Sequence, residues 1–83
     1  MDVRNQPLKL AIAGLGAIGL PIARRVDAGD IPGIELVAVA ARDEAKARKS
    51  MAGFRSPPPL VALAALADMA DVIVECLPSK HFL

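Results

Sequence analysis

A chain of 83 residues has room for one small domain, and its 54% hydrophobic content separates it from disordered chains, which are poor in apolar residues. Ten basic residues against nine acidic ones leave a net charge of +1, and the only aromatic residues are two phenylalanines. This composition excludes the clustered basic face and the stacking rings that nucleic-acid binding requires.

The first elements alternate between strand and helix patterns. Residues 8–13 (LKLAIA) form a short apolar run that stops at Gly14, which is typical of a strand covered on both faces. The period then changes to four, which predicts a helix whose apolar positions are Ile18, Ile22 and Val26. The turn-forming residues 29–33 end this helix.

A second strand and helix follow. Residues 34–40 (IELVAVA) are β-branched and apolar, which predicts a second buried strand. Asp43 is a suitable N-cap for a helix over residues 44–51, and we expect Gly53 to provide its left-handed exit.

The last third of the chain begins after three consecutive prolines. Residues 60–69 are rich in Ala and Leu and predict another helix. Residues 72–76 (VIVEC) predict a third buried strand, stopped by Pro78. This order of elements predicts an α/β fold of the Rossmann type, a doubly wound parallel sheet with helices on both faces. The chain would supply its first half and the strand that opens the second half.

The motif with chemical meaning is Gly14-Leu15-Gly16-Ala17-Ile18-Gly19, a G-x-G-x-x-G pattern directly after the first strand. In a dinucleotide-binding turn the first glycine makes the tight turn, the second lets the diphosphate approach the backbone, and the third lets the helix pack closely. The N–H groups around Ala17 and Ile18 would point at the phosphates. A glycine-rich turn used only for packing is the alternative.

The corner after the second strand bears on the choice between NAD and NADP. No carboxylate ends this strand, and Arg42 lies just past it, so we expect a preference for NADP, whose 2′-phosphate a guanidinium can bind. Use of NAD as well is expected because Asp43 is near. The alternative is that Arg42 is a solvated loop residue and Asp43 only a helix cap.

The third strand ends at Cys76, Leu77 and Pro78, which we expect to border the nicotinamide side of the cofactor. Cys76 is interpreted as a small core thiol rather than a nucleophile. Lys80 and His81 are interpreted as surface or second-layer residues. No residue of this chain is expected to be catalytic or to bind a metal.

Three segments, AIAGLGAIG, ELVAVAARD and ADVIVECLP, resemble the L-aspartate dehydrogenase family. They are similar in layout to homoserine dehydrogenases and to glucose-fructose oxidoreductase-like enzymes. The resemblance implies oxidation of L-aspartate by NAD(P)⁺ to iminoaspartate, which hydrolyses to oxaloacetate and ammonia. It assigns Arg42 to the adenosine ribose, residues 76–78 to the nicotinamide side, and the diphosphate to Gly14, Gly16, Ala17, Ile18 and Gly19.

The same resemblance sets the expected domain organisation. Residues 1–83 would be the N-terminal part of an NAD(P)-binding Rossmann domain, and the substrate domain with its catalytic histidine would lie beyond Leu83. The fragment alone is expected to be inactive. We expect the full-length enzyme to be a cytoplasmic homo-oligomer that acts on a small molecule and contacts neither nucleic acid nor membrane.

Other functions stay open. Residues 19–23 (GLPIA) resemble the G-x-P-M-A segment of β-hydroxyacid dehydrogenases. A non-catalytic NAD(P)-sensing module would use the same turn, and S-adenosylmethionine and FAD domains share the first strand–helix–strand unit. Against an S-adenosylmethionine site, Ala40 stands where a carboxylate would be needed.

Overall fold

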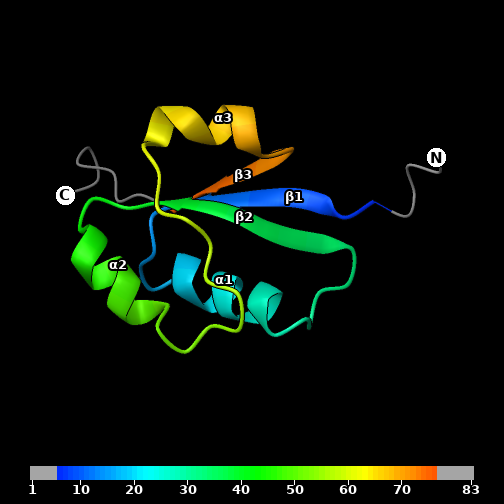
Figure 1. The fold of residues 1–83 in the computed structure, drawn as a ribbon, viewed down its shortest axis with the longest axis horizontal. Helices are drawn as coiled ribbons and strands as arrows, with labels where there is room; N and C mark the ends of the chain where they lie inside the picture. Colours follow the sequence, from blue (N-terminus) through cyan, green and yellow to red (C-terminus); the bar gives the residue numbers. More distant parts are fainter. Residues whose placement is uncertain (1–5, 77–83) are drawn as a thin grey trace.

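A computed structural model describes residues 6–76. Its three strands form one parallel sheet in the order β2-β1-β3, so the third strand lies on the far side of β1 from β2. Helix α1 covers one face and α3 the other, and α2 lies on the same side as α1, toward the carboxyl ends of the strands (Figure 1). The elements in chain order are β1 (Leu8–Ala13), α1 (Gly19–Asp27), β2 (Ile34–Ala40), α2 (Glu44–Ser50), the 3-10 helix η2 (Leu63–Ala65), α3 (Leu66–Met69) and β3 (Val72–Glu75). The predicted doubly wound α/β fold, incomplete as expected, is confirmed.

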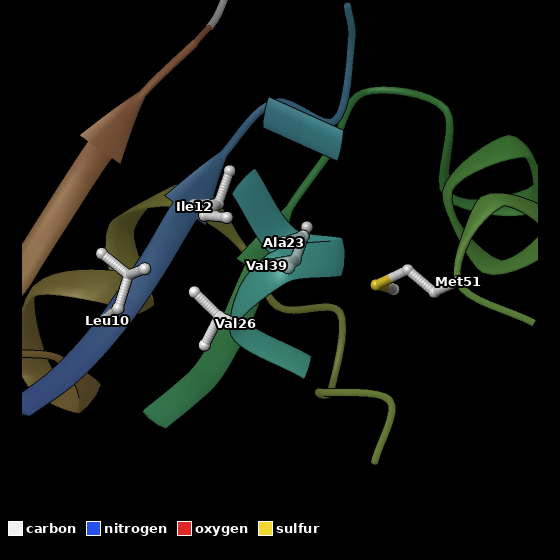
Figure 2. Close-up of a cluster of buried hydrophobic side chains, with 6 residues drawn as sticks. All are labelled: Leu10, Ile12, Ala23, Val26, Val39 and Met51. Atoms are coloured by element: carbon white, nitrogen blue, oxygen red, sulfur yellow. The ribbon is translucent and has the colours of Figure 1, made fainter. Parts of the chain in front are cut away.

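The two faces of the sheet are packed by side chains of different size. On the α1 face most core residues are large, and Ala23 is the one small residue among the six shown together in Figure 2: Leu10, Ile12, Ala23, Val26, Val39 and Met51. On the α3 face, alanines of β1 and β2 lie under the fully buried Leu66, and they are Ala11, Ala13, Ala38 and Ala40. The small alanine side chains leave room for the short helix α3 to approach the sheet closely.

Strand β2 contains a β-bulge that the sequence pattern does not predict. Leu10 pairs with Leu36, but the next residue, Ala11, pairs with Ala38, so Val37 is one residue in excess. Leu36 therefore packs in the α1 core, whereas Val37 and Ala38 both pack on the α3 side. A bulge of this kind bends its strand and changes where the following side chains point.

Helix α1 begins later than its apolar period indicates. Ile18 is the N-cap and is 69% exposed, so its expected place on the apolar face of the helix is wrong. The buried face is made by Gly19, Ala23 and Val26. The helix ends, as predicted, at the turn of residues 29–33, where Gly29 has φ 81°. The Gly29 N–H donates to the Val26 carbonyl, and the Asp30 N–H donates to the Arg25 carbonyl.

Helix α2 is capped as the sequence predicts, but it leaves differently. The Oδ1 atom of Asp43 accepts a hydrogen bond from the Lys46 N–H at 3.1 Å. The predicted left-handed exit at Gly53 is wrong, because among the described glycines only Gly14, Gly29 and Gly33 have positive φ. The chain instead turns at the C-cap Met51, whose carbonyl accepts from the Phe54 N–H at 3.0 Å.

The predicted helix over residues 60–69 is wrong in its first half. Leu60 forms a parallel bridge with Val39, so residues 59–61 run extended along the outer edge of β2. Two backbone hydrogen bonds make this contact, from the Val39 N–H to the Pro59 carbonyl at 3.0 Å and from the Val61 N–H to the Val39 carbonyl at 2.9 Å. The prolines explain the difference, because they hold the backbone extended and disfavour helix in the residue before each ring.

Strand β3 is an apolar strand with exposed side chains. Val72 is 40% exposed and Ile73 is 42% exposed, so the prediction of a third buried strand is wrong about burial. The start of the strand is fixed to β1 by Asp71, whose N–H donates to the Lys9 carbonyl at 2.8 Å. Its Oδ2 atom accepts from the Lys9 N–H at 3.0 Å. The strand belongs to the sheet, but in the described part of the chain little covers it.

Candidate functional site

The three segments predicted to bind the cofactor, each directly after one of the strands, lie at one edge of the sheet. Because the strands are parallel, the residues after their carboxyl ends lie together: Gly14 after β1, Ala41 after β2 and Cys76 after β3. Two backbone hydrogen bonds of 2.7 Å join the strand ends, from the Gly14 N–H to the Ala40 carbonyl and from the Cys76 N–H to the Ala13 carbonyl. The strand order reverses beside β1, which is where doubly wound sheets bind ligands.

Gly14 makes the turn out of the sheet. Its φ is 97°, a conformation that side chains with a Cβ disfavour. The residue is buried, and its N–H is already bonded to Ala40. Gly14 therefore shapes the turn and does not itself offer a donor to a ligand.

Gly19 brings the first turn of α1 against the end of β1. A Cβ at this position would overlap with the carbonyl oxygen of Gly14 and would lie 3.3 Å from Cγ2 of Ile12. The backbone of the turn cannot move away cheaply, because Gly14 is bonded to the sheet. Glycine at this position is thus required by packing, as the motif predicts.

Gly16 is different from both. Its φ is not positive, the residue is exposed, and an added Cβ would meet no atom within 4 Å. Neither the backbone conformation nor the packing of the described residues requires a glycine here. The missing Cβ leaves open space at Gly16, two residues before the N-cap of α1.

The same turn presents backbone donors. The Gly16 carbonyl accepts from the Leu20 N–H at 3.1 Å. The N–H groups of Gly16, Ala17 and Ile18 meet no acceptor within residues 6–76. Within residues 6–76 no side chain caps α1, and its first turn holds no acidic residue. Unpaired N–H groups and the positive end of a helix dipole are the features that anion-binding helix starts share in other proteins.

The corner after β2 is a shallow hollow of about 150 Å³. Its walls are the end of β2, the start of α2 and the chain after the proline segment, with the residues Ala40, Ala41, Arg42, Glu44, Val61, Ala62 and Leu63. Arg42 is exposed, whereas Asp43 is engaged as the helix cap. The contribution of residues 61–63 was not predicted, because their composition favours a helix.

The corner after β3 contains Cys76, which is half-buried rather than part of the core. Its N–H is bonded to the end of β1, so the residue lies beside the turn at Gly14. The other predicted residues of this corner, Leu77 and Pro78, lie outside the described residues, as do Lys80 and His81.

Residues 6–76 contain neither a candidate metal site nor a candidate membrane span. No three His, Cys, Asp or Glu side chains in this range gather in a way that could hold a metal ion. No helix in the same range has the length and apolar character needed to cross a membrane.

Comparison with known proteins gives the family. The model of the family described as "Homoserine dehydrogenase, NAD binding domain" matches residues 14–82. An L-aspartate dehydrogenase of Bradyrhizobium diazoefficiens is 47% identical over 77 residues, which cover 93% of this chain and 27% of the relative. L-aspartate dehydrogenase 3 of Bordetella bronchiseptica is 39% identical over 90% of this chain and 28% of the relative. An L-aspartate dehydrogenase of Methanocella arvoryzae is 37% identical over 81% of this chain and 24% of the relative.

These matches confirm the resemblance that the three sequence segments indicate. No solved structure matches the chain. The chain spans about a quarter of the length of the relatives. With a family model that extends from Gly14 over the rest of the described residues, the chain belongs to the family of homoserine dehydrogenase NAD-binding domains.

Proposed function

We propose that this chain is the cofactor-binding portion of an NAD(P)-dependent dehydrogenase and that the turn at residues 14–19 binds the diphosphate of the cofactor. The observation that carries the proposal is Gly16, a glycine that neither the backbone conformation nor the packing of residues 6–76 requires. Its missing Cβ leaves open space at a residue whose N–H, like those of Ala17 and Ile18, is unpaired among the described residues at the start of α1. The family description, which names NAD binding, supports NAD or NADP as the ligand.

In this proposal each corner of the sheet edge takes one part of the cofactor. Gly14 and Gly19 shape the turn, and the backbone of Gly16, Ala17 and Ile18 binds the diphosphate. Arg42 lies at the corner that receives the adenosine ribose, where its exposed guanidinium can bind a 2′-phosphate.

The nicotinamide side belongs to Cys76 and to the two residues that follow it, Leu77 and Pro78. A dinucleotide bound across this edge supplies the hydride acceptor of the reaction, and the chain holds and orients it.

We propose L-aspartate as the substrate, on the names of the three relatives. The reaction would be oxidation of the CH–NH₂ group by NAD(P)⁺, with release of oxaloacetate and ammonia after hydrolysis of the imine. The substrate domain and the catalytic residues would correspond to the part of the relatives that this chain does not cover. A homoserine-type dehydrogenase is the second candidate, because the matching family carries that description. We also propose a cytoplasmic enzyme.

The cofactor proposal is tested with Gly16→Ala in the intact protein that carries this chain. The added methyl group occupies the space of the diphosphate, so the Kd values of both NAD⁺ and NADP⁺ should rise at least about tenfold, which corresponds to about 1.4 kcal/mol. The melting temperature should stay within about 2 °C, because the Cβ meets no atom within 4 Å.

Gly53→Ala is the matched control, since a Cβ there also meets nothing within 4 Å and its φ is not positive. It should leave both Kd values unchanged. Unchanged binding in Gly16→Ala, measured by isothermal titration, would contradict the proposal. The substrate is tested separately by comparing L-aspartate and L-homoserine as reductants of NAD(P)⁺, with ammonia release as the second readout.

A further inference from the structure

The hollow after β2 contains one side chain of each charge. Arg42 and Glu44 both line it, on either side of the cap residue that begins α2. The other lining residues are apolar: Ala40, Ala41, Val61, Ala62 and Leu63. Any recognition of charge in this hollow therefore depends on these two side chains.

The two neighbouring carboxylates have different surroundings. Asp43 does not line the hollow, and its Oδ1 atom is held at 3.1 Å by the Lys46 N–H. Glu44 has no such backbone bond in the described residues. Its Oε1 atom lies 3.7 Å from Nη2 of Arg48, one helical turn further on, and the two side chains are 56% and 67% exposed. A pair this long and this exposed is weak, so Glu44 remains available to a ligand.

We propose that Glu44 is a specificity-determining residue of the cofactor site and that Arg48 tunes it. The Glu44 carboxylate accepts hydrogen bonds from the adenosine ribose hydroxyls of NAD and repels the 2′-phosphate of NADP. Arg48 partly neutralises this carboxylate and so reduces the repulsion. The inference rests on the proposed cofactor site, and it places the discriminating carboxylate on the first turn of α2 rather than at the end of β2, where Ala40 stands.

The charges determine the sign of each effect. A phosphate monoester carries about −1.5 to −2 charges at neutral pH, so a carboxylate in the same hollow opposes it while the Arg42 guanidinium attracts it. A ribose diol is neutral and donates hydrogen bonds, which a carboxylate accepts. Glu44 thus acts against Arg42 for NADP, and the ratio of the two affinities reflects their balance.

The experiment titrates the intact protein with NAD⁺, NADP⁺, adenosine 2′,5′-bisphosphate and 5′-AMP. Glu44→Gln should lower the Kd of both 2′-phosphorylated ligands by about 3- to 10-fold, the range expected for one exposed charge. It should raise the Kd of NAD⁺ and 5′-AMP by about threefold, because a neutral amide is a weaker acceptor for the ribose hydroxyls than a carboxylate. Arg48→Gln should raise the Kd of the 2′-phosphorylated ligands by about 2- to 3-fold and leave the other two unchanged.

Matched controls remove the same charges elsewhere. The first control is Glu35→Gln, because Glu35 lies near the opposite end of β2, where it is the strand-register partner of Lys9. The second is Arg25→Gln, because Arg25 lies in the last turn of α1. Both should leave the preference for NADP over NAD as it is. If Glu44→Gln shifts the ratio no more than Glu35→Gln while the dinucleotides still bind, the inference is wrong and the cofactor site stands. If no nucleotide binds the unaltered protein, the cofactor site itself is wrong, and the inference with it.

Discussion

The glycine turn of residues 14–19 and the charged corner of residues 40–44 lie at the same sheet edge but are built in opposite ways. The turn depends on its backbone. Gly14 is required by a positive φ and Gly19 by close packing, whereas Gly16 leaves open space beside unpaired backbone N–H groups. In the corner exposed charged side chains line a shallow hollow. Backbone groups bind a diphosphate that every dinucleotide shares, whereas side chains can distinguish one dinucleotide from another.

The contrast predicts where mutations act on folding and where they act on selectivity. Changes in the turn should affect stability or the binding of all dinucleotides equally. Changes to Arg42 and Glu44, the charged side chains that line the hollow, should alter the ratio between ligands while leaving the fold intact.

Gly19→Ala should have the largest effect. The new Cβ overlaps with the Gly14 carbonyl oxygen, and that segment is bonded to the sheet, so relief requires moving backbone. We expect a loss of about 3 kcal/mol or more in the free energy of unfolding, at the upper end of overpacking effects. Chemical denaturation of this variant beside Gly16→Ala measures the effect. Equal stability of the two variants would contradict the close approach at Gly19.

Arg42→Ala tests whether the corner selects the cofactor. Loss of a charge-assisted contact to the 2′-phosphate should weaken NADP⁺ by about 1–3 kcal/mol and leave NAD⁺ nearly unchanged. Isothermal titration of the intact protein gives both values, with the exposed Arg24→Ala of α1 as the control for loss of a positive charge. Losses of the same size for both dinucleotides would leave Arg42 without a role in selection.

Asp43→Ala tests the side chain that holds the corner in place. The variant removes the acceptor of the Lys46 N–H, so we expect a loss of about 1 kcal/mol in the free energy of unfolding. Asp43→Asn is the matched control, because asparagine caps helices about as well as aspartate. Thermal melting of the pair separates capping from charge, and an equally destabilised Asn variant would show that the carboxylate charge is what matters.

Ionic strength should give the smallest effect. Raising the salt concentration from about 0.05 to 0.5 M screens the exposed charges of the corner strongly. The Kd of NADP⁺ should therefore rise more than that of NAD⁺, so that the preference shifts by a few-fold. A preference that does not depend on salt would indicate that the 2′-phosphate is not recognised by exposed charges at all.

The features that were predicted correctly from sequence are those with a local cause. Residues 8–13 and 34–40 are strands with the predicted bounds, because each is an unbroken apolar run flanked by residues that end a strand. The cap at Asp43 and the turn at Gly29 follow from side chains and backbone within a few residues. The turn at Gly14 and the close packing at Gly19 have local causes as well, because the strand before them and the helix after them set the backbone there.

The features that were missed have distant causes. The Ala/Leu composition at residues 60–69 favours a helix, but pairing with Val39, some twenty residues earlier, draws Leu60 into an extended segment. The bulge at Val37 depends on register with β1. The exposure of β3 depends on which elements pack over it, and a run of apolar residues does not predict that. Because residues 61–63 line the hollow, the missed pairing also hid one wall of the site.

The proline segment beside β2 has a consequence for association between molecules. Residues 57–59 lead into the outermost paired position of the sheet, and three successive residues there lack an N–H group. An incoming strand from another molecule would find too few donors to form a ladder along these prolines, and prolines at a sheet edge are a known protection against aggregation.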